Sequence, residues 1–183
     1  MLGGGYSARL NAEIRVKRGL TYGASSELSA RRGGGAFLAA AQTKNSAGPE
    51  VAALMRAELD RLGAEPVPAE ELAPRTSTLT GAYDRSLETN EGMATRLAGW
   101  AVQDVPLGAL NTFTADVRAV QAGAVQKVAR AHLRSAETSV VIAGQAESFR
   151  ATLGEAFQEA EIIPQKALDL DAISLRGPAK GGK

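Results

Sequence analysis

The 183-residue chain contains no cysteine, one histidine and few aromatic residues. Without cysteine there is no disulfide, no thiolate nucleophile and no metal site with cysteine ligands. A zinc hydrolase usually draws two ligands from histidine, so the single His132 cannot support such a site alone. A structural or surface role is the better interpretation of His132. Aromatic residues make up 4% of the chain, which disfavours an aromatic-rich β-sandwich.

Strong charge and long hydrophobic runs are also missing. The formal net charge is +1 without a long run of one sign, so the electrostatic signature of nucleic-acid binding is absent. No apolar run approaches ~18 residues, and we expect neither a membrane span nor a signal peptide. The lack of cysteine is compatible with an exported bacterial protein, which favours the periplasm slightly over the cytoplasm without deciding the compartment.

The opening of the chain predicts a glycine turn, a short helix and a strand hairpin. Ser7 suits the start of the helix, and Gly19 suits a left-handed residue at its end. The stretch Leu20–Ala30 alternates as a strand does, and a turn at 31–35 leads into a second strand, Ala36–Thr43, whose many alanines also suit a helix. The alternation places four residues on one face of the first strand: Tyr22, Ala24, Ser26 and Leu28.

Helices are predicted over most of the remaining chain. An amphipathic helix ends at Gly63, and a longer helical region begins near Glu70 or Pro74. Three further helices are marked by apolar residues at helical spacing: Met93, Leu97 and Trp100; Leu110, Phe113 and Val117; Val125, Val128 and Leu133. The β-branched run Thr138–Ala143 predicts a third, central strand, and another helix is expected from about Ala146 to Glu159.

This order of elements predicts an α+β domain with a mainly antiparallel sheet and helices packed on one face. We expect residues 1–165 to form the domain and residues 166–183 to form a charged tail. Three strands make a thin sheet whose open edge would normally need cover. Strands preceding Met1 could provide that cover, so the domain is expected to be incomplete at its N-terminus.

Two patterns that can indicate a site have simpler explanations here. Residues 3–5 are all glycine and precede a helix, as in a phosphate-binding loop, but no Gly-Lys-Ser/Thr motif follows. Close helix packing or a flexible turn is the better interpretation. Glu70 and Glu71 are adjacent on a helix, so their carboxylates point apart and we interpret both as solvated surface.

Arg15 and Tyr22 are the candidate functional pair. Arg15 lies near the end of the first helix and Tyr22 near the start of the following strand. The turn at Gly19 folds these elements together, so both side chains can converge on one point. A guanidinium and a phenol can donate hydrogen bonds to a peptide carbonyl or an oxyanion. From spacing alone, a surface arginine beside a half-buried tyrosine is the simpler explanation.

Longer blocks of sequence carry a family resemblance. The main blocks are Gly-Gly-Gly-Tyr-Ser-Ala-Arg-Leu-Asn at 3–11, Ile-Arg at 14–15 and Arg-Gly-Leu-Thr-Tyr-Gly at 18–23. Supporting blocks lie at 70–72, 87–89, 125–130 and 140–144, and the likeness extends to about Arg176. Together they resemble the pitrilysin/insulinase metallopeptidase family, and more narrowly its C-terminal non-catalytic domain or the corresponding separate subunit.

The resemblance implies a function in which two halves cooperate. In this family a catalytic domain carries His-x-x-Glu-His and a distal glutamate for zinc, and a homologous domain without them closes over the peptide substrate. The family's inactive half offers an arginine and a tyrosine seven positions apart, the spacing of Arg15 and Tyr22. The resemblance therefore implies that both contact the bound peptide and help to stabilise the transition state.

It also implies that this chain binds no cofactor itself and that zinc belongs to a catalytic partner domain or subunit, in a dimer or a two-domain assembly. The family's strands before the glycine block have no counterpart in this sequence. The main alternative is a catalytically inert assembly module of the same fold. A stand-alone enzyme is third, because the histidine inventory argues against it.

Overall fold

The structure, a computed structural model, describes residues 1–154, 157 and 159–176. Within these residues the sheet is one antiparallel hairpin of β1 (Thr21–Arg31) and β2 (Gly34–Thr43), preceded by a short π-helix, η1 (Asn11–Val16). Five α-helices follow: α1 (Gly48–Ala64), α2 (Ala69–Ser86), α3 (Asn90–Val102), α4 (Ala109–Ala119) and α5 (Ala122–His132). The predicted α+β class is therefore confirmed, with each predicted helix before residue 133 present.

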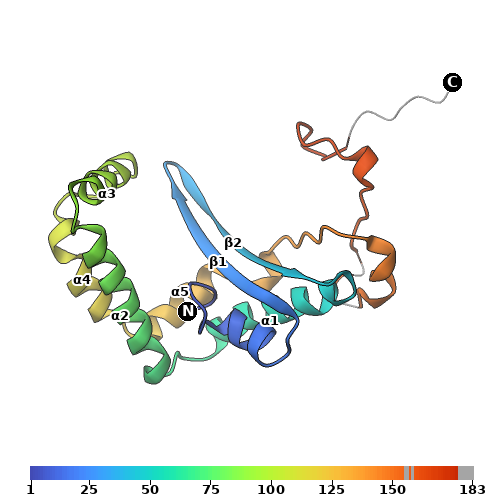
Figure 1. Cartoon of the computed structure of the whole chain (residues 1–183), viewed down its shortest axis with the longest axis horizontal. Helices are drawn as coiled ribbons and strands as arrows, with labels where there is room; N and C mark the ends of the chain where they lie inside the picture. Colours follow the sequence, from blue (N-terminus) through green and yellow to red (C-terminus); the bar gives the residue numbers. More distant parts are fainter. Residues whose placement is uncertain (155–156, 158, 177–183) are drawn as a thin grey trace.

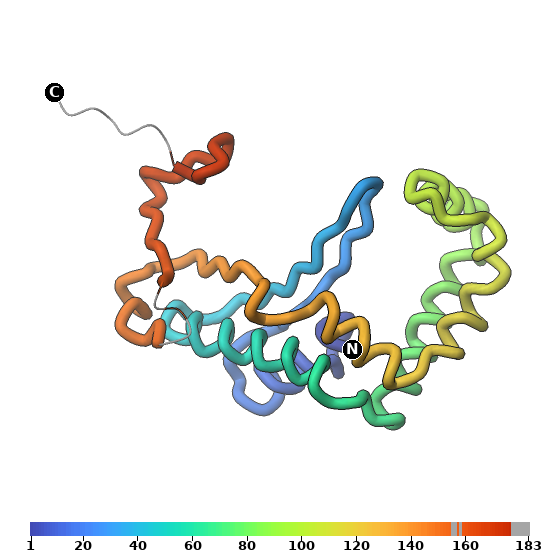
Figure 2. Tube along the Cα trace, turned by 180° about the vertical axis from the view of Figure 1, so that it is seen from behind, coloured from blue at the N-terminus to red at the C-terminus, as the bar shows by residue number. Residues whose placement is uncertain are grey.

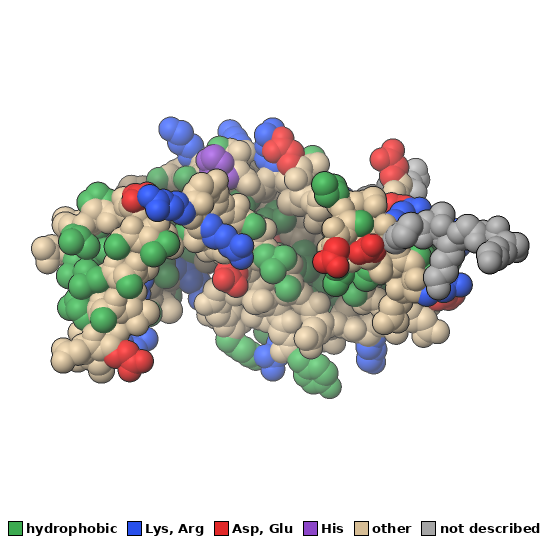
Figure 3. All heavy atoms as spheres, turned by 90° about the horizontal axis from the view of Figure 1, so that it is seen from above, with side chains coloured by type: hydrophobic (Ala, Val, Ile, Leu, Met, Phe, Trp, Pro, Cys, Tyr) green, Lys and Arg blue, Asp and Glu red, His purple; other side chains and the backbone are tan. Residues whose placement is uncertain are grey.

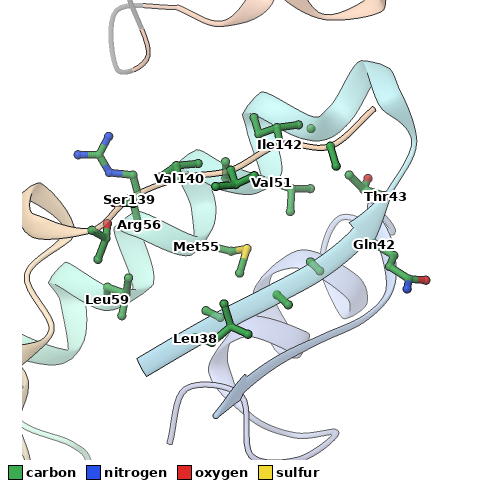
Figure 4. Close-up of a pocket in the computed structure, with 18 of the residues that line it drawn as sticks. Leu38, Gln42, Thr43, Val51, Met55, Arg56, Leu59, Ser139, Val140 and Ile142 are labelled. Atoms are coloured by element: carbon green, nitrogen blue, oxygen red, sulfur yellow. The ribbon is translucent and has the colours of Figure 1, made fainter. Parts of the chain in front are cut away.

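The predicted third strand is not formed. Thr138–Ala143 runs extended, but it pairs with no strand in the described part of the chain. A strand exists only through its ladder with a neighbour, and here a groove separates this segment from β2 (Figure 4). Its β-branched composition predicted the backbone conformation correctly and the pairing wrongly.

The predicted helix at 146–159 is also wrong where the structure describes it. Two short 3-10 turns, Ala146–Ser148 and Arg150–Thr152, stand in its place, and Gly154 has a positive φ of 62°. A helix this short is marginal in water unless one face packs against the protein. Of its apolar residues before 154, only Phe149 is buried. Residues 155, 156 and 158 of the prediction lie outside the described residues, as do 177–183 of the predicted tail, whose boundary at 166 stays a prediction.

The main core lies on one face of the hairpin. Phe37, Ala39 and Ala41 of β2 pack against it, and α1 and α5 lie side by side beneath (Figures 1 and 2). The buried cluster draws on the N-terminal segment, β1, α1, α5 and the link after α1: Leu2, Leu10, Ile14, Ala24, Val51, Leu59, Leu62, Val67 and Ala129. The α1 helix begins with Pro49 and Glu50 in its first turn, residue types that suit a helix N-terminus.

Helices α2, α3 and α4 form an arm beside the hairpin (Figures 1 and 2). The arm has its own small aromatic core, in which the Tyr83 ring stacks on Phe113 at 4.2 Å and on Trp100 at 6.2 Å between centroids. The Tyr83 hydroxyl donates to the Leu110 carbonyl at 2.7 Å. Among the described residues, exposed polar contacts join the end of the arm to the hairpin tip, such as the ion pair of Arg32 with Asp104 at 3.6 Å. The arm is thus held mainly at its base.

A buried ion pair connects the first turn of α2, which is the base of the arm, to the N-terminal segment. The Arg9 guanidinium donates to both Glu71 carboxylate oxygens at 2.8–3.1 Å, and the two side chains are 7% and 22% exposed. Burial of the Glu71 carboxyl acts to raise its pKa, but the hydrogen bonds and positive charge of Arg9 outweigh burial and lower the pKa. The interpretation of Glu71 as solvated surface is therefore wrong, whereas Glu70 is exposed as expected.

Close backbone approach explains the first glycine of the opening block. The Gly3 carbonyl accepts a hydrogen bond from the Ser26 amide of β1 at 3.3 Å. A Cβ at Gly3 would lie 2.2 Å from the Ser26 nitrogen, which no real side chain tolerates, whereas a Cβ at Gly4 would meet nothing within 4 Å. Gly3 therefore serves close packing, but against a strand and not against a helix as predicted.

Replacing Gly3 by alanine should destabilise the fold, because the new methyl group must push the N-terminal segment away from β1. We expect Gly3→Ala to lower the free energy of unfolding by about 1–3 kcal/mol. Gly4→Ala, the matched control, should change it by less than about 0.5 kcal/mol. Urea unfolding measures both variants, and equal stabilities would show that the close approach is absent in solution.

Replacing Glu71 by glutamine should leave the buried Arg9 charge without its partner. We expect a loss of about 2–4 kcal/mol in the free energy of unfolding at pH 7, while Glu70→Gln should have little effect. Because the folded-state pKa of Glu71 is lowered, its contribution is complete above the unfolded carboxyl pKa of about 4.3 and is lost as pH falls through the folded pKa. Below that pH the difference between wild type and Glu71→Gln should shrink. A gap that stays constant from pH 7 into the acid range would contradict this assignment.

Candidate functional site

The candidate site is built on the junction between η1 and β1. The turn closes with a hydrogen bond from the Gly19 amide to the Arg15 carbonyl and another from the Leu20 amide to the Ile14 carbonyl, both at 2.9 Å. Gly19 has a φ of +64°, the left-handed conformation predicted for it. Ile14 is fully buried, so the segment that carries Arg15 is anchored in the core.

Tyr22 lies on a β-bulge that the alternation pattern missed. Thr21 pairs with Thr43 and Ala24 with Ala41, so β1 advances three residues while β2 advances two. The extra residue places both Thr21 and Ala24 on the buried face, at 8% and 4% exposure, and leaves Tyr22 93% exposed. The expectation that Tyr22 shares the face of Ala24 is therefore wrong, because simple alternation assumes an unbroken ladder.

Two polar side chains hold this bulge in shape. The Thr21 hydroxyl accepts from the Gly23 amide at 3.0 Å and lies 2.6 Å from the Gln42 carbonyl oxygen. The buried Asn11 amide accepts from the Ala24 N–H at 2.9 Å and donates to the Ala24 carbonyl at 2.8 Å. The Asn11 side chain thus pairs with the backbone N–H and C=O of Ala24 at the bulge, as the backbone of a neighbouring strand would.

Arg15 has a neighbour that the sequence analysis did not single out. Its guanidinium carbon lies 4.8 Å from the centroid of the Tyr6 ring, a cation–π contact, and Tyr6 is itself 66% exposed. The only sequence signal for Tyr6 was its place in the glycine block. Across the described residues, the Tyr22 hydroxyl has no hydrogen-bond partner. Convergence of Arg15 and Tyr22 on a shared ligand stays a prediction.

The described side chains do not fit a metal centre. No group of three or more His, Cys, Asp or Glu residues within the described ranges could hold an ion. His132 is the last residue of α5 and is exposed, which agrees with a surface role. Charges of both signs are interspersed on the face in Figure 3, and hydrophobic side chains gather over the arm. None of the described helices is long and apolar enough to cross a membrane.

Comparisons with known proteins add the family context. The family model for the peptidase M16 inactive domain matches residues 1–74, which include Arg15 and Tyr22. A solved structure described as the peptidase M16 inactive domain from Pseudomonas fluorescens is similar at 26% identity and a TM-score of 0.67, over 73% of this chain and 32% of that one. No curated protein gave a significant match.

Two further solved structures share the fold. A protease from Helicobacter pylori matches at 21% identity and a TM-score of 0.64, over 71% of this chain and 32% of that one. A conserved protein from Enterococcus faecalis V583 matches at 22% identity and a TM-score of 0.62, over 70% and 30%. The chain thus spans about a third of the length of the solved structures that it matches.

The hydroxyl of Thr21 should be needed for the bulge. Thr21→Val keeps the side-chain shape but leaves the Gly23 amide and the Gln42 carbonyl without this partner, so we expect a loss of about 1–3 kcal/mol in the free energy of unfolding. Thr21→Ser keeps the hydroxyl and should be milder. Chemical denaturation gives the stabilities, and NMR signals of the Tyr22 ring report the bulge. Equal stability of the two variants, with unshifted Tyr22 signals, would show that the hydroxyl does not maintain it.

Proposed function

We propose that this chain is the non-catalytic half of a zinc-dependent peptidase of the M16 (pitrilysin) family, because residues 1–74 match the family model of the peptidase M16 inactive domain and the fold is similar to that of a solved inactive domain. In this proposal the chain closes the substrate chamber against a catalytic domain or subunit that carries His-x-x-Glu-His. Arg15 and Tyr22 reach from this half to the bound peptide. The substrate is a peptide.

Tyr22 is exposed on a bulge that hydrogen bonds of Thr21 and Asn11 hold in place, and this observation supports the proposed function best. A tyrosine that is 93% exposed does not contribute to the core, yet Thr21 and Asn11 fix the backbone on either side of it. Bulges often occur beside active sites, where they redirect a side chain. Its hydroxyl, without a partner among the described residues, is available to donate to a ligand.

Arg15 adds a positively charged hydrogen-bond donor to the neutral donor of Tyr22. It lies at the opposite end of the same turn, and its guanidinium is half-buried against the Tyr6 ring, which limits its freedom before a ligand binds. Donors that are already oriented lose little entropy when they stabilise a developing oxyanion. We therefore assign Arg15 to binding the negative charge that grows on a peptide carbonyl oxygen, with Tyr22 donating a second hydrogen bond.

The proposal assigns the zinc site to a catalytic partner, because this chain cannot form one. One histidine in the whole sequence cannot provide a zinc site of the histidine-rich hydrolase type. Zinc bound by the partner would polarise the peptide carbonyl and supply the attacking hydroxide. This chain would contribute positioning, oxyanion stabilisation and exclusion of water from the closed chamber.

Arg15→Ala and Tyr22→Phe test the proposal. Each removes one donor, so peptide cleavage by this chain combined with a polypeptide carrying His-x-x-Glu-His should fall by about 100-fold in kcat/KM. Arg18→Ala is the matched control, because Arg18 lies in the same turn but is paired with Glu13. Its activity should stay near that of wild type.

Thermal unfolding separates function from folding in this experiment. Tyr22 is exposed, so Tyr22→Phe should unfold with the wild-type midpoint. Unchanged cleavage in both variants would overturn the catalytic role of the pair. Cleavage that is absent with every M16-type partner would instead favour the inert assembly module.

A further inference from the structure

Three cations lie close together at the end of η1, namely Arg15, Lys17 and Arg18, and they differ in what they contact. The Lys17 ammonium lies 2.7 Å from one Glu13 carboxylate oxygen, and Arg18 pairs with the other oxygen and donates to the Glu13 carbonyl at 3.0 Å. Hydrogen bonds from Lys17 and Arg18 lower the pKa of Glu13, so its carboxylate stays charged and engaged by both. Within the described residues, Arg15 has no carboxylate partner.

The contact that Arg15 does make is with an aromatic ring. Its guanidinium carbon lies 4.8 Å from the centroid of the Tyr6 ring. A ring face attracts a cation without accepting its N–H donors as a hydrogen-bonding group would. A carboxylate would instead accept two of these donors and neutralise the charge. The Tyr6 ring therefore restricts the guanidinium and leaves its charge and its donors available to a ligand.

Tyr6 lies at the exposed end of a β-turn. The Ala8 amide donates to the Gly5 carbonyl at 3.0 Å, which closes the turn with Tyr6 as its second residue. Ala8 is fully buried, whereas Tyr6 is 66% exposed. In the described part of the chain, the Tyr6 side chain makes no hydrogen bond, and its one ring contact is with Arg15. Core packing therefore does not explain the position of this ring.

Two side chains hold the turn at its opposite ends. The Asn11 amide donates to the Gly5 carbonyl at 3.1 Å. At the other end, the Arg75 guanidinium donates to the Ser7 hydroxyl at 3.0 Å and to the Ser7 carbonyl at 2.5 Å. Arg75 belongs to α2, the first helix of the arm, and lies 68 residues further along the chain. The turn thus connects the arm to the ring that contacts Arg15.

We propose that Tyr6 and Arg75 are positioning residues for Arg15. Arg75 fixes the turn 5–8 from α2, and the Tyr6 ring on that turn orients the Arg15 guanidinium before a peptide binds. A donor that is already oriented loses less entropy when it stabilises the transition state. This inference rests on the proposed function, because the orientation of Arg15 affects cleavage only if Arg15 contacts the peptide.

Tyr6→Leu tests the role of the ring, since leucine is apolar but has no π electrons. With a polypeptide that carries His-x-x-Glu-His and an unstructured fluorogenic peptide as substrate, we expect kcat/KM to fall by about 5-fold. The loss should lie in kcat more than in KM, because Arg15 acts on charge that develops in the transition state. The conservative variant Tyr6→Phe keeps the ring and should recover most of this loss.

Arg75→Ala tests the link to the arm. It should lower kcat by about 3-fold, a smaller effect because Asn11 still holds the other end of the turn. Arg85→Ala is the matched control, since Arg85 is exposed on the same helix and makes no hydrogen bond or ion pair in the described structure. In a Tyr6→Leu background, Arg75→Ala should have no further effect on kcat. Thermal unfolding identifies a temperature at which all variants are folded.

NMR of this chain alone gives a second readout that needs no catalytic partner. The ring current of Tyr6 should shift the signals of the Arg15 side-chain CH₂ protons upfield. The shift should persist in Tyr6→Phe, disappear in Tyr6→Leu and decrease in Arg75→Ala. A change in stability alone would not produce this pattern in the folded protein.

The variants distinguish failure of this inference from failure of the proposed function. Unchanged cleavage in Arg15→Ala would overturn both. Reduced cleavage in Arg15→Ala with unchanged cleavage in Tyr6→Leu, or a wild-type chain without the ring-current shift, would overturn this inference alone. If Tyr6→Leu lowers cleavage equally with and without Arg15, the ring acts on the peptide directly, and the positioning role is wrong.

Discussion

The hydrogen bonds between Asn11 and Ala24 connect most of what is distinctive about this chain. They join the N-terminal segment to β1 at the bulge, and the same Asn11 amide also reaches the Gly5 carbonyl at 3.1 Å. Asn11 is 7% exposed, so these bonds lie in a medium where an unpaired amide would be costly. The glycine turn, η1 and the bulge therefore keep their positions together, and with them the exposed Tyr22.

The parts of the molecule around Asn11 and the bulge are stabilised by different contacts. The hairpin base, α1 and α5 share the buried core, while the arm of α2–α4 relies on its own aromatic stack and on the Arg9–Glu71 pair. At the far side of the core, the groove beside β2 leaves two strand edges without neighbours in the described structure. The chain spans about a third of the length of the solved structures that it matches, and its described part is well packed at the centre and leaves these edges unpaired.

Local signals predicted much of the fold and part of the site. Apolar spacing located the five α-helices, and Gly19 was identified as the left-handed residue. The bulge at Thr21–Ala24 was not predictable from alternation, since it depends on how Asn11 and Thr21 satisfy the backbone. Tyr6 was missed for a similar reason: its contact with Arg15 joins residues that no short-range pattern connects. The prediction of a strand at 138–143 was right about the extended conformation, which depends on local residues. It was wrong about pairing, which depends on residues far apart in the sequence.

The sequence by itself determined the α+β class, the likeness of residues 1–74 to the peptidase M16 inactive domain and the inability of one histidine to form a zinc centre. Those properties depend on composition and on short motifs, which involve no contacts between residues far apart in the sequence. Only the tertiary structure decided that Tyr22 is exposed, that Glu71 is paired with buried Arg9 and that residues 138–143 lie unpaired beside a groove. Each of these depends on contacts between residues far apart in sequence, where desolvation and hydrogen-bond geometry outweigh local preference.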